Sequence, residues 1–209
     1  MMPFAKKTAV IMCLALMGTA KPIHPAGALS QRAQAEGSDA TILVEPTMYQ
    51  IYPFNKEYAT NLPHVEIQRT GNTSLLENVA VFEGIPANAR TCQLGWTQAE
   101  RDERKNFTVH GNGLLSTQQL SRFPDEGVSW ASIAPIVDEA VEEGWPLLHP
   151  DTTGWPAIST AESHIAGFVD CAETIYFKIH LDPRNGDGYV LLEQDPKNSL
   201  TLTFTLPTD

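Results

Sequence analysis

The sequence predicts an all-β protein: an antiparallel β-sandwich with one short helix, a long loop insertion and one disulfide bond. Apolar and polar residues alternate in roughly nine short runs, the pattern of strands that have one face in a core and one in water. Gly, Pro, Asn and Asp separate these runs at the spacing found in β-sandwiches. Because 42% of the 209 residues are hydrophobic, the chain can fill one core, and we expect a single domain spanning residues 41–209.

The predicted strands are clearest from residue 64 onward. The runs are 64–69, 79–83, 92–96, 107–110, 175–181, 188–192 and 200–206. Residues 185–188 (Asn-Gly-Asp-Gly) form a strong turn signal, so we expect 175–181 and 188–192 to pair as a hairpin. The expected core comprises Val65, Ile67, Val81, Leu94, Trp96, Phe168, Ile175, Phe177, Ile179, Leu200, Leu202 and Phe204.

Residues 132–143 break the alternation and predict the single helix. Ser132 suits the N-cap, Pro135 the first turn, and Gly144 the position just after the last turn. The apolar residues of this segment share one face, so we expect the helix to lie over an open end or edge of the sandwich. The segment that follows, which contains Trp145 and Trp155, is expected to be a long loop outside the regular sheet.

The N-terminus has the pattern of a secretory signal peptide. Lys6 and Lys7 precede an uncharged apolar run at 8–17, and small residues follow at 18–20. The apolar run is shorter than the ~20 residues that a membrane span needs. We therefore predict a signal peptide at 1–20.

Residues 21–40 are polar and rich in Ala, Gly and Pro, and we expect them to form a flexible N-terminal arm. A later cleavage after Ala28 also fits the small residues there. Either position predicts a secreted protein, located outside the cell or in the cell wall.

The charge balance excludes several classes of partner. Lys and Arg number 14 against 25 Asp and Glu, a formal net charge of -11, and loss of two lysines with the signal peptide would make it -13. Nucleic acids and anionic membrane surfaces need a cationic surface, so neither is expected to bind. The expected partners are a cell-wall glycan or a protein, with no membrane span. No spacing of ligands suggests a metal site, and no cofactor is expected.

The cysteines and glycosylation motifs fit an extracellular protein. Removal of the signal peptide leaves Cys92 and Cys171, which we expect to form one disulfide; two separate buried thiols are the alternative. Asn72 and Asn106 begin N-x-S/T triplets and are candidate N-glycosylation sites of a glycoprotein in a eukaryotic host.

No recognised catalytic motif is present, and we predict no catalytic residues. Trp145 and Trp155 are the candidate ligand-binding residues, because two indole rings in a loop can form a platform for a sugar ring. They could equally close the end of the sandwich, since a Trp side chain buries a large area. His164 and His180 fall in predicted strands and could meet across a sheet, although a surface position explains each of them.

Short motifs resemble a known family. Residues 81–86 (Val-Phe-Glu-Gly-Ile-Pro) and 90–94 (Arg-Thr-Cys-Gln-Leu) resemble the F-x-x-I-P…G-K-T-C-x-L block of a fungal secreted family. This is the C-terminal domain of the But-type proteins, named for binding a ubiquitin-like-activating enzyme. Residues 165–171 resemble its I-A-x-F-x-C block, and residues 192–205 resemble its closing strand.

The resemblance covers about residues 42–206 and implies a β-sandwich with one disulfide between its sheets. It implies no established catalytic residues. The chain departs from the pattern at Arg90 and in an enlarged segment between residues 121 and 163. Because the activating enzyme is cytosolic and nuclear, we do not expect a secreted chain to bind it.

We therefore predict a secreted, non-catalytic β-sandwich protein that acts at the cell surface or outside the cell as a binding or wall-associated module. One alternative is an extracellular enzyme acting on a polysaccharide or small metabolite through paired carboxylates, with Asp151, Glu162 and Asp170 as candidate acids. A second alternative is a secreted effector that binds a host protein through its acidic surface.

Overall fold

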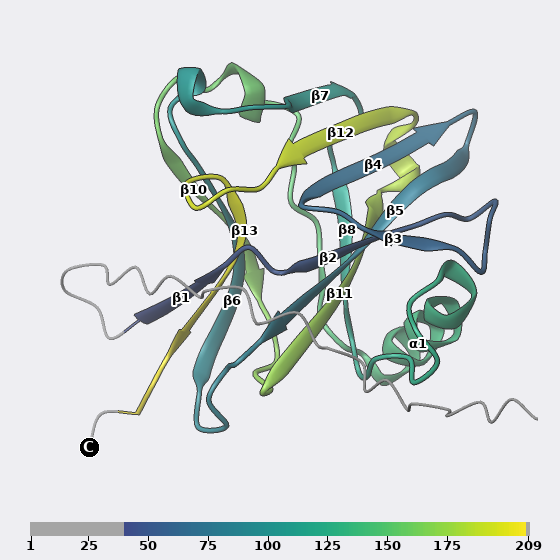
Figure 1. Ribbon diagram of the computed structural model, residues 1–209, viewed down its shortest axis with the longest axis vertical. Coiled ribbons are helices and arrows are strands. Elements are labelled where there is room, and N and C mark those ends of the chain that lie inside the picture. The colour runs from purple at the N-terminus through teal and green to yellow at the C-terminus, as the bar shows by residue number, and fades with distance from the viewer. Residues whose placement is uncertain (1–39, 208–209) are drawn as a thin grey trace, which may run out of the picture.

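The computed structural model describes residues 40–207, which form an antiparallel β-sandwich with one α-helix (Figure 1). The predicted signal peptide and nearly all of the predicted arm lie outside the described residues. The strands are β1 (Ala40–Val44), β2 (Thr47–Ile51), β3 (Ala59–Asn61), β4 (His64–Thr70), β5 (Thr73–Glu83), β6 (Arg90–Gln98), β7 (Phe107–Gly111), β8 (Leu115–Leu120), β9 (Leu147–Leu148), β10 (Glu162–Phe168), β11 (Thr174–Leu181), β12 (Gly188–Glu193) and β13 (Ser199–Thr205). The helix is α1 (Trp130–Glu143), and three 3-10 turns are η1 (Arg101–Glu103), η2 (Trp155–Ala157) and η3 (Pro183–Asn185).

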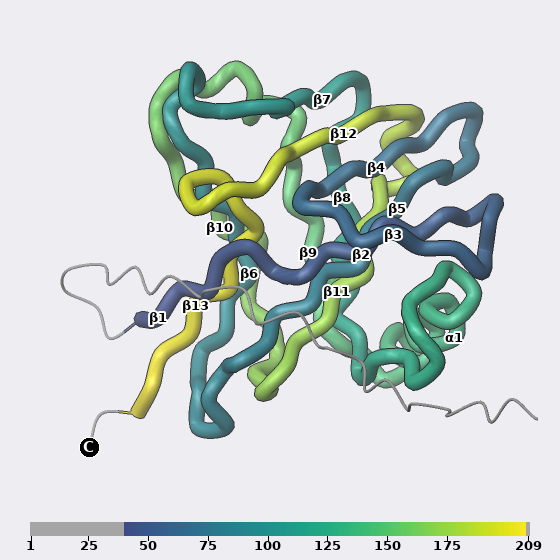
Figure 2. Tube along the Cα trace, viewed as in Figure 1, coloured from purple at the N-terminus to yellow at the C-terminus, as the bar shows by residue number. Residues whose placement is uncertain are grey.

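The strands form two sheets. The smaller has the order β1-β13-β6-β10, and the larger has the order β7-β12-β4-β5-β11-β8-β9, with β2 paired to β5 and β3 paired to β2. In the tube drawing, β4, β12 and β7 run across the upper end of the molecule, crossing the direction of β6, β8 and β11 (Figure 2). We call these three strands the end ribbon. Its inward side chains, among them Val65 and Ile67, join the core and close this end of the sandwich.

The main core lies between the sheets and is built by the predicted alternation. Phe82 and Phe177, on the neighbouring strands β5 and β11, meet edge to face with ring centroids 6.2 Å apart. Every expected core residue is buried except Phe168, whose prediction was wrong: it is 65% exposed. The backbone is irregular between Ile165 and Gly167, where the register of β10 shifts. This shift breaks simple alternation along the strand, so Phe168 lies on the outer face.

The helix covers the outer face of the larger sheet. Its buried residues Ile133 and Ile136 pack against Ile51, Val79 and Leu120, which form a second apolar cluster. The helix was predicted to lie over an open end or edge of the sandwich, whereas it packs on the outer face of the larger sheet. A sheet that is apolar on both faces in one region needs a cover on its outer side, and α1 supplies it.

The helix starts earlier than predicted. Ser129, not Ser132, is the N-cap: its side chain accepts a hydrogen bond from the Ser132 N–H, and the Ser132 side chain accepts one from the Ser129 N–H. Pro135 consequently lies inside the helix. Gly144 has φ 78° and ends the helix in the left-handed conformation, as predicted.

The predicted pairing of 175–181 with 188–192 was wrong. Strand β11 pairs with β5 and β8, whereas β12 pairs with β4 and β7. The link between them carries η3, and the buried Asp182 carboxylate accepts hydrogen bonds from the backbone and guanidinium of Arg184. Because β5 and β8 already occupy both edges of β11, β12 cannot pair with β11 and instead joins the end ribbon.

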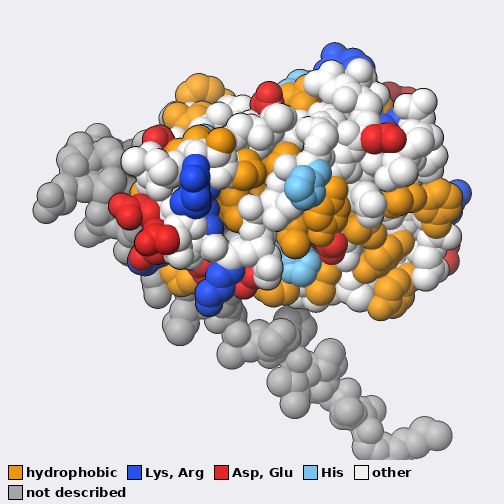
Figure 3. All heavy atoms as spheres, turned by 90° about the horizontal axis from the view of Figure 1, so that it is seen from above, with side chains coloured by type: hydrophobic (Ala, Val, Ile, Leu, Met, Phe, Trp, Pro, Cys, Tyr) orange, Lys and Arg blue, Asp and Glu red, His pale blue; other side chains and the backbone are white. Residues whose placement is uncertain are grey.

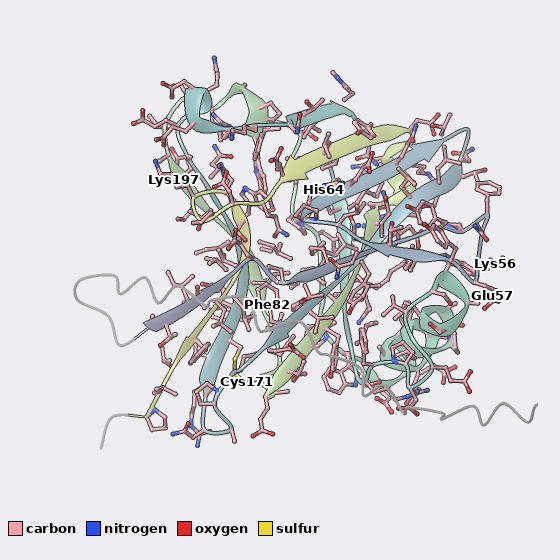
Figure 4. The ribbon with its side chains drawn as sticks, in the orientation of Figure 1. Lys56, Glu57, His64, Phe82, Cys171 and Lys197 are labelled. Carbon is pink, nitrogen blue, oxygen red and sulfur yellow. A yellow bond between two sulfur atoms is a disulfide. The ribbon has the colours of Figure 1, made fainter. Side chains whose placement is uncertain are left out.

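The predicted disulfide joins Cys92 in β6 to Cys171, which lies between β10 and β11, with Cα atoms 5.3 Å apart (Figure 4). Because β10 belongs to the smaller sheet and β11 to the larger, this bond ties the smaller sheet to the crossing between the sheets. Within residues 40–207, no helix has the length and apolar character needed to span a bilayer.

Candidate binding surface on the β2–β3 hairpin

The two tryptophans singled out in the sequence lie in different surroundings. The Trp155 ring stacks on His164 at 4.2 Å between centroids, and it packs against the main core beside Trp96. Trp145 follows Gly144, the C-cap of α1, and donates a hydrogen bond from Nε1 to Glu143 Oε2 at 2.8 Å. Across residues 40–207, no aromatic contact joins Trp145 to Trp155, so the two rings do not stack into one platform.

Trp155 covers a cavity between the sheets. The cavity has a volume of about 20 Å³, and its lining includes Trp96, Leu115, His164 and Leu192. A volume of ~10–15 Å³ already corresponds to a single water molecule, so this space is a packing gap rather than a ligand pocket.

The candidate acids lie on separate exposed segments. The Asp151 carboxylate accepts from the Thr153 N–H, and the Glu162 carboxylate accepts from the Thr160 hydroxyl. Asp170 contacts Gln119 through its backbone. No hydrogen bond or ion pair of the described chain links any two of these acids. Nor do residues 40–207 contain a group of three His, Cys, Asp or Glu side chains placed to hold a metal ion.

The two histidines do not meet. His164 is in β10 of the smaller sheet, whereas His180 is in β11 of the larger one. His180 lies near a buried ion pair between Lys178 Nζ and Glu77 Oε2, 3.1 Å apart, on the outer face of that sheet. Burial and the neighbouring Lys178 charge lower the pKa of His180 from 6.5 to about 4.

Both candidate glycosylation sites are exposed. Asn72 lies in the turn between β4 and β5, and Asn106 directly precedes β7. Asn106 Nδ2 donates a hydrogen bond to Glu193 Oε2 at 2.6 Å. A glycan on either residue would project into solvent, and glycosylation of each stays a prediction.

A surface that the sequence analysis did not single out lies on the β2–β3 hairpin. The connecting residues 52–58 (Tyr-Pro-Phe-Asn-Lys-Glu-Tyr) carry Phe54 and Tyr58, whose side chains are 70% and 48% exposed. The Tyr58 ring lies 5.3 Å from the Tyr52 ring. We call Tyr52, Phe54 and Tyr58 the hairpin aromatics. Viewed from above, the molecule shows several hydrophobic patches on its surface, one of them at the right (Figure 3).

The hairpin is held firmly although its tip is exposed. Its backbone turns through hydrogen bonds from the Asn55 N–H to the Tyr52 carbonyl and from the Tyr58 N–H to the Asn55 carbonyl. Lys56 joins it to α1 in two ways: its carbonyl accepts the Ala131 N–H at 2.9 Å, and its Nζ lies 5.0 Å above the Trp130 ring (Figure 4). The exposed rings are therefore presented on a fixed support.

Polar groups lie beside the hairpin aromatics. The Tyr52 hydroxyl contacts Gln50 and Thr60, and Gln50 in turn contacts the carboxylate of Glu66 on β4. His64 and Glu66 are partly exposed, with side chains 22% and 24% accessible. Aromatic rings next to partly exposed hydrogen-bonding groups can bind a ligand that has both apolar faces and hydroxyls.

The sequence carried a signal for this surface. Three aromatic residues in a stretch of seven, interrupted by Pro53 and the polar run 55–57, indicate a turn that carries aromatic rings. Apolar and polar residues alternate only weakly in 47–51, because both faces of this strand are apolar. Met48 enters the main core, whereas Tyr49 and Ile51 enter the second apolar cluster under α1.

Comparisons of the chain with protein-family models, curated proteins and solved structures find no match. The resemblance to the fungal But-type domain therefore rests on the motifs alone.

Proposed function

We propose that this chain is a secreted, non-catalytic module that binds a neutral cell-wall polysaccharide through the hairpin aromatics. The observation that carries the proposal is the pair of exposed rings, Phe54 and Tyr58, on a hairpin anchored at its base and to α1. Ligand binding by a preorganised surface avoids the ordering cost that a mobile loop incurs.

The chemistry of the surface supports a sugar ligand. Aromatic rings pack against the apolar faces of sugar rings, while the exposed Asn55 and Glu57 offer partners for hydroxyl groups. The net charge of -11 opposes binding of anionic polymers, whereas a neutral glycan meets no such repulsion.

The test measures depletion of the mature protein from solution by insoluble cellulose, chitin and β-1,3-glucan, with reducing-sugar release followed in the same tubes. Binding of at least one glycan without sugar release is expected. The double variant Phe54→Ala, Tyr58→Ala should bind about tenfold more weakly, equivalent to ~1.4 kcal/mol. Its melting temperature should change little, because exposed side chains contribute little to folding.

Phe168→Ala is the matched control, since Phe168 is 65% exposed on a different face. This variant should bind like the wild type. Loss of binding in Phe168→Ala with retention in the hairpin variant would transfer the contact to β10 and contradict the proposed surface. Release of reducing sugar would instead favour the enzyme alternative, and absence of binding to every glycan would favour a protein partner.

A further inference from the structure

A chain of hydrogen bonds connects the hairpin aromatics to the end ribbon. Its middle member is Gln50, which is only 3% exposed. Gln50 Nε2 donates to Glu66 Oε2 at 3.1 Å, and Gln50 Oε1 accepts the Tyr52 hydroxyl at 3.0 Å. A side-chain amide has one donor end and one acceptor end. Because the Glu66 carboxylate can only accept, it turns the NH₂ group toward itself and leaves the oxygen for Tyr52.

The other end of the chain holds the Tyr52 ring. The Tyr52 hydroxyl also contacts Thr60 Oγ1 at 2.9 Å, so the ring is fixed at its far end by two partners. Tyr58 lies against this ring, with the two ring planes at 31°. The position of the exposed Tyr58 ring therefore depends on a ring that is itself held through Gln50.

Glu66 gathers several donors at the origin of the chain. Its Oε1 accepts the Tyr189 hydroxyl of β12 at 3.0 Å, and its Oε2 lies 3.5 Å from His64 Nε2. These contacts come from the end ribbon, whose inward face is part of the core. The carboxylate is thus fixed relative to the body of the molecule, not to the hairpin.

We propose that Glu66 is a positioning residue of the binding surface, which acts through Gln50 to fix Tyr52 and thereby the Tyr58 ring. This inference rests on the proposed function for its effect on affinity, but its effect on the ring is independent of any ligand. Glu66→Gln would replace a carboxylate, which can only accept, with an amide that can donate as well as accept. The Gln50 amide would then no longer be held in one orientation.

The test combines binding and spectroscopy on the mature protein. Affinity for a soluble oligomer of the glycan that binds is measured for Glu66→Gln, Tyr52→Phe and the double variant. Each single variant should bind about three- to tenfold more weakly, and the double variant no more weakly than the worse single one, because both break one chain. Glu83→Gln, which alters an exposed carboxylate at the end of β5, is the matched control and should leave affinity unchanged.

Losses that multiply in the double variant would overturn the proposal, since they would show that Glu66 affects binding independently of Tyr52. Proton NMR of the Tyr58 ring without ligand is the second measurement. Glu66→Gln and Tyr52→Phe should shift its resonances alike, whereas an unchanged Tyr58 spectrum in Glu66→Gln would also overturn the proposal. If the wild type binds no glycan, the proposed function fails, and the NMR result still decides the role of Glu66.

Discussion

At the scale of single residues, His180 on the outer face of the larger sheet should make the free energy of unfolding depend on pH. It faces Lys178 from its own strand, Glu77 from β5, Arg69 from β4 and Asp182 just beyond β11. Its Nδ1 is buried without a hydrogen-bond partner. Burial is the largest cause of its lowered pKa, and the positive charges of Lys178 and Arg69 add to it, while the two carboxylates oppose it.

Stability should therefore fall in acid because of this one side chain. With a pKa near 4 in the folded protein and 6.5 as its ordinary value, His180 binds a proton more readily in the unfolded chain between those pH values. The free energy of unfolding should rise from pH 4 to 6.5 by up to ~3 kcal/mol from this source. Urea unfolding at a series of pH values should show a flatter profile for His180→Gln than for the wild type.

The exposed His110 provides the comparison. His110→Gln should keep the wild-type slope of stability against pH. Parallel profiles for the wild type and His180→Gln would contradict the assignment of this slope to His180.

At the scale of elements, α1 is held both by its cap and by its apolar face. Ser129→Ala removes the side-chain acceptor of the Ser132 N–H and should lower the free energy of unfolding by about 1 kcal/mol. Chemical denaturation measures this loss. Ser159→Ala, at an exposed position in the loop before β10, should change it by less than ~0.5 kcal/mol. Equal effects of the two substitutions would show that the cap contributes nothing.

The sequence predicts elements better than it predicts their partners. Strands such as β4 and β11 alternate because one face meets the core, and their bounds came out nearly correct. Strand β8 (Leu-Ser-Thr-Gln-Gln-Leu) was missed because it is buried throughout, with polar residues satisfied inside: Gln118 Nε2 donates to the Trp145 and Pro146 carbonyls. Such contacts depend on segments far along the chain, which no local pattern records.

The candidate site shows the same limit. Aromatic residues at 52, 54 and 58 are visible in the sequence, but their exposure is not. Trp155 was a candidate ligand-binding residue because its indole ring falls in a predicted loop, yet the ring packs on Trp96 and His164. The choice between surface and core is made by β6 and β10, which meet Trp155 only after the sheets form. The link from Glu66 to Tyr52 likewise requires β4 to leave β5 where β2 begins to pair with it.

At the scale of the whole molecule, the disulfide limits how far the unfolded chain can expand. Cys92 and Cys171 are 79 residues apart, and closing such a loop contributes ~4–5 kcal/mol in the chain-entropy estimate. The double variant Cys92→Ala, Cys171→Ala should lose up to this amount in denaturant unfolding. A reducing agent should destabilise the wild type and leave the variant unchanged. A reducing agent that affects both equally would show that its action lies elsewhere.

The anchoring of the hairpin has a consequence for how this protein can change. Lys56 and the Gln50–Tyr52 contacts hold the base and one side of the hairpin, while Phe54 at its tip remains 70% exposed. Under the proposed function, substitutions at the tip would alter which glycan binds without disturbing the packing that keeps the chain folded. Selectivity and stability would then depend on different residues, so that a protein engineer would be able to vary the first while keeping the second.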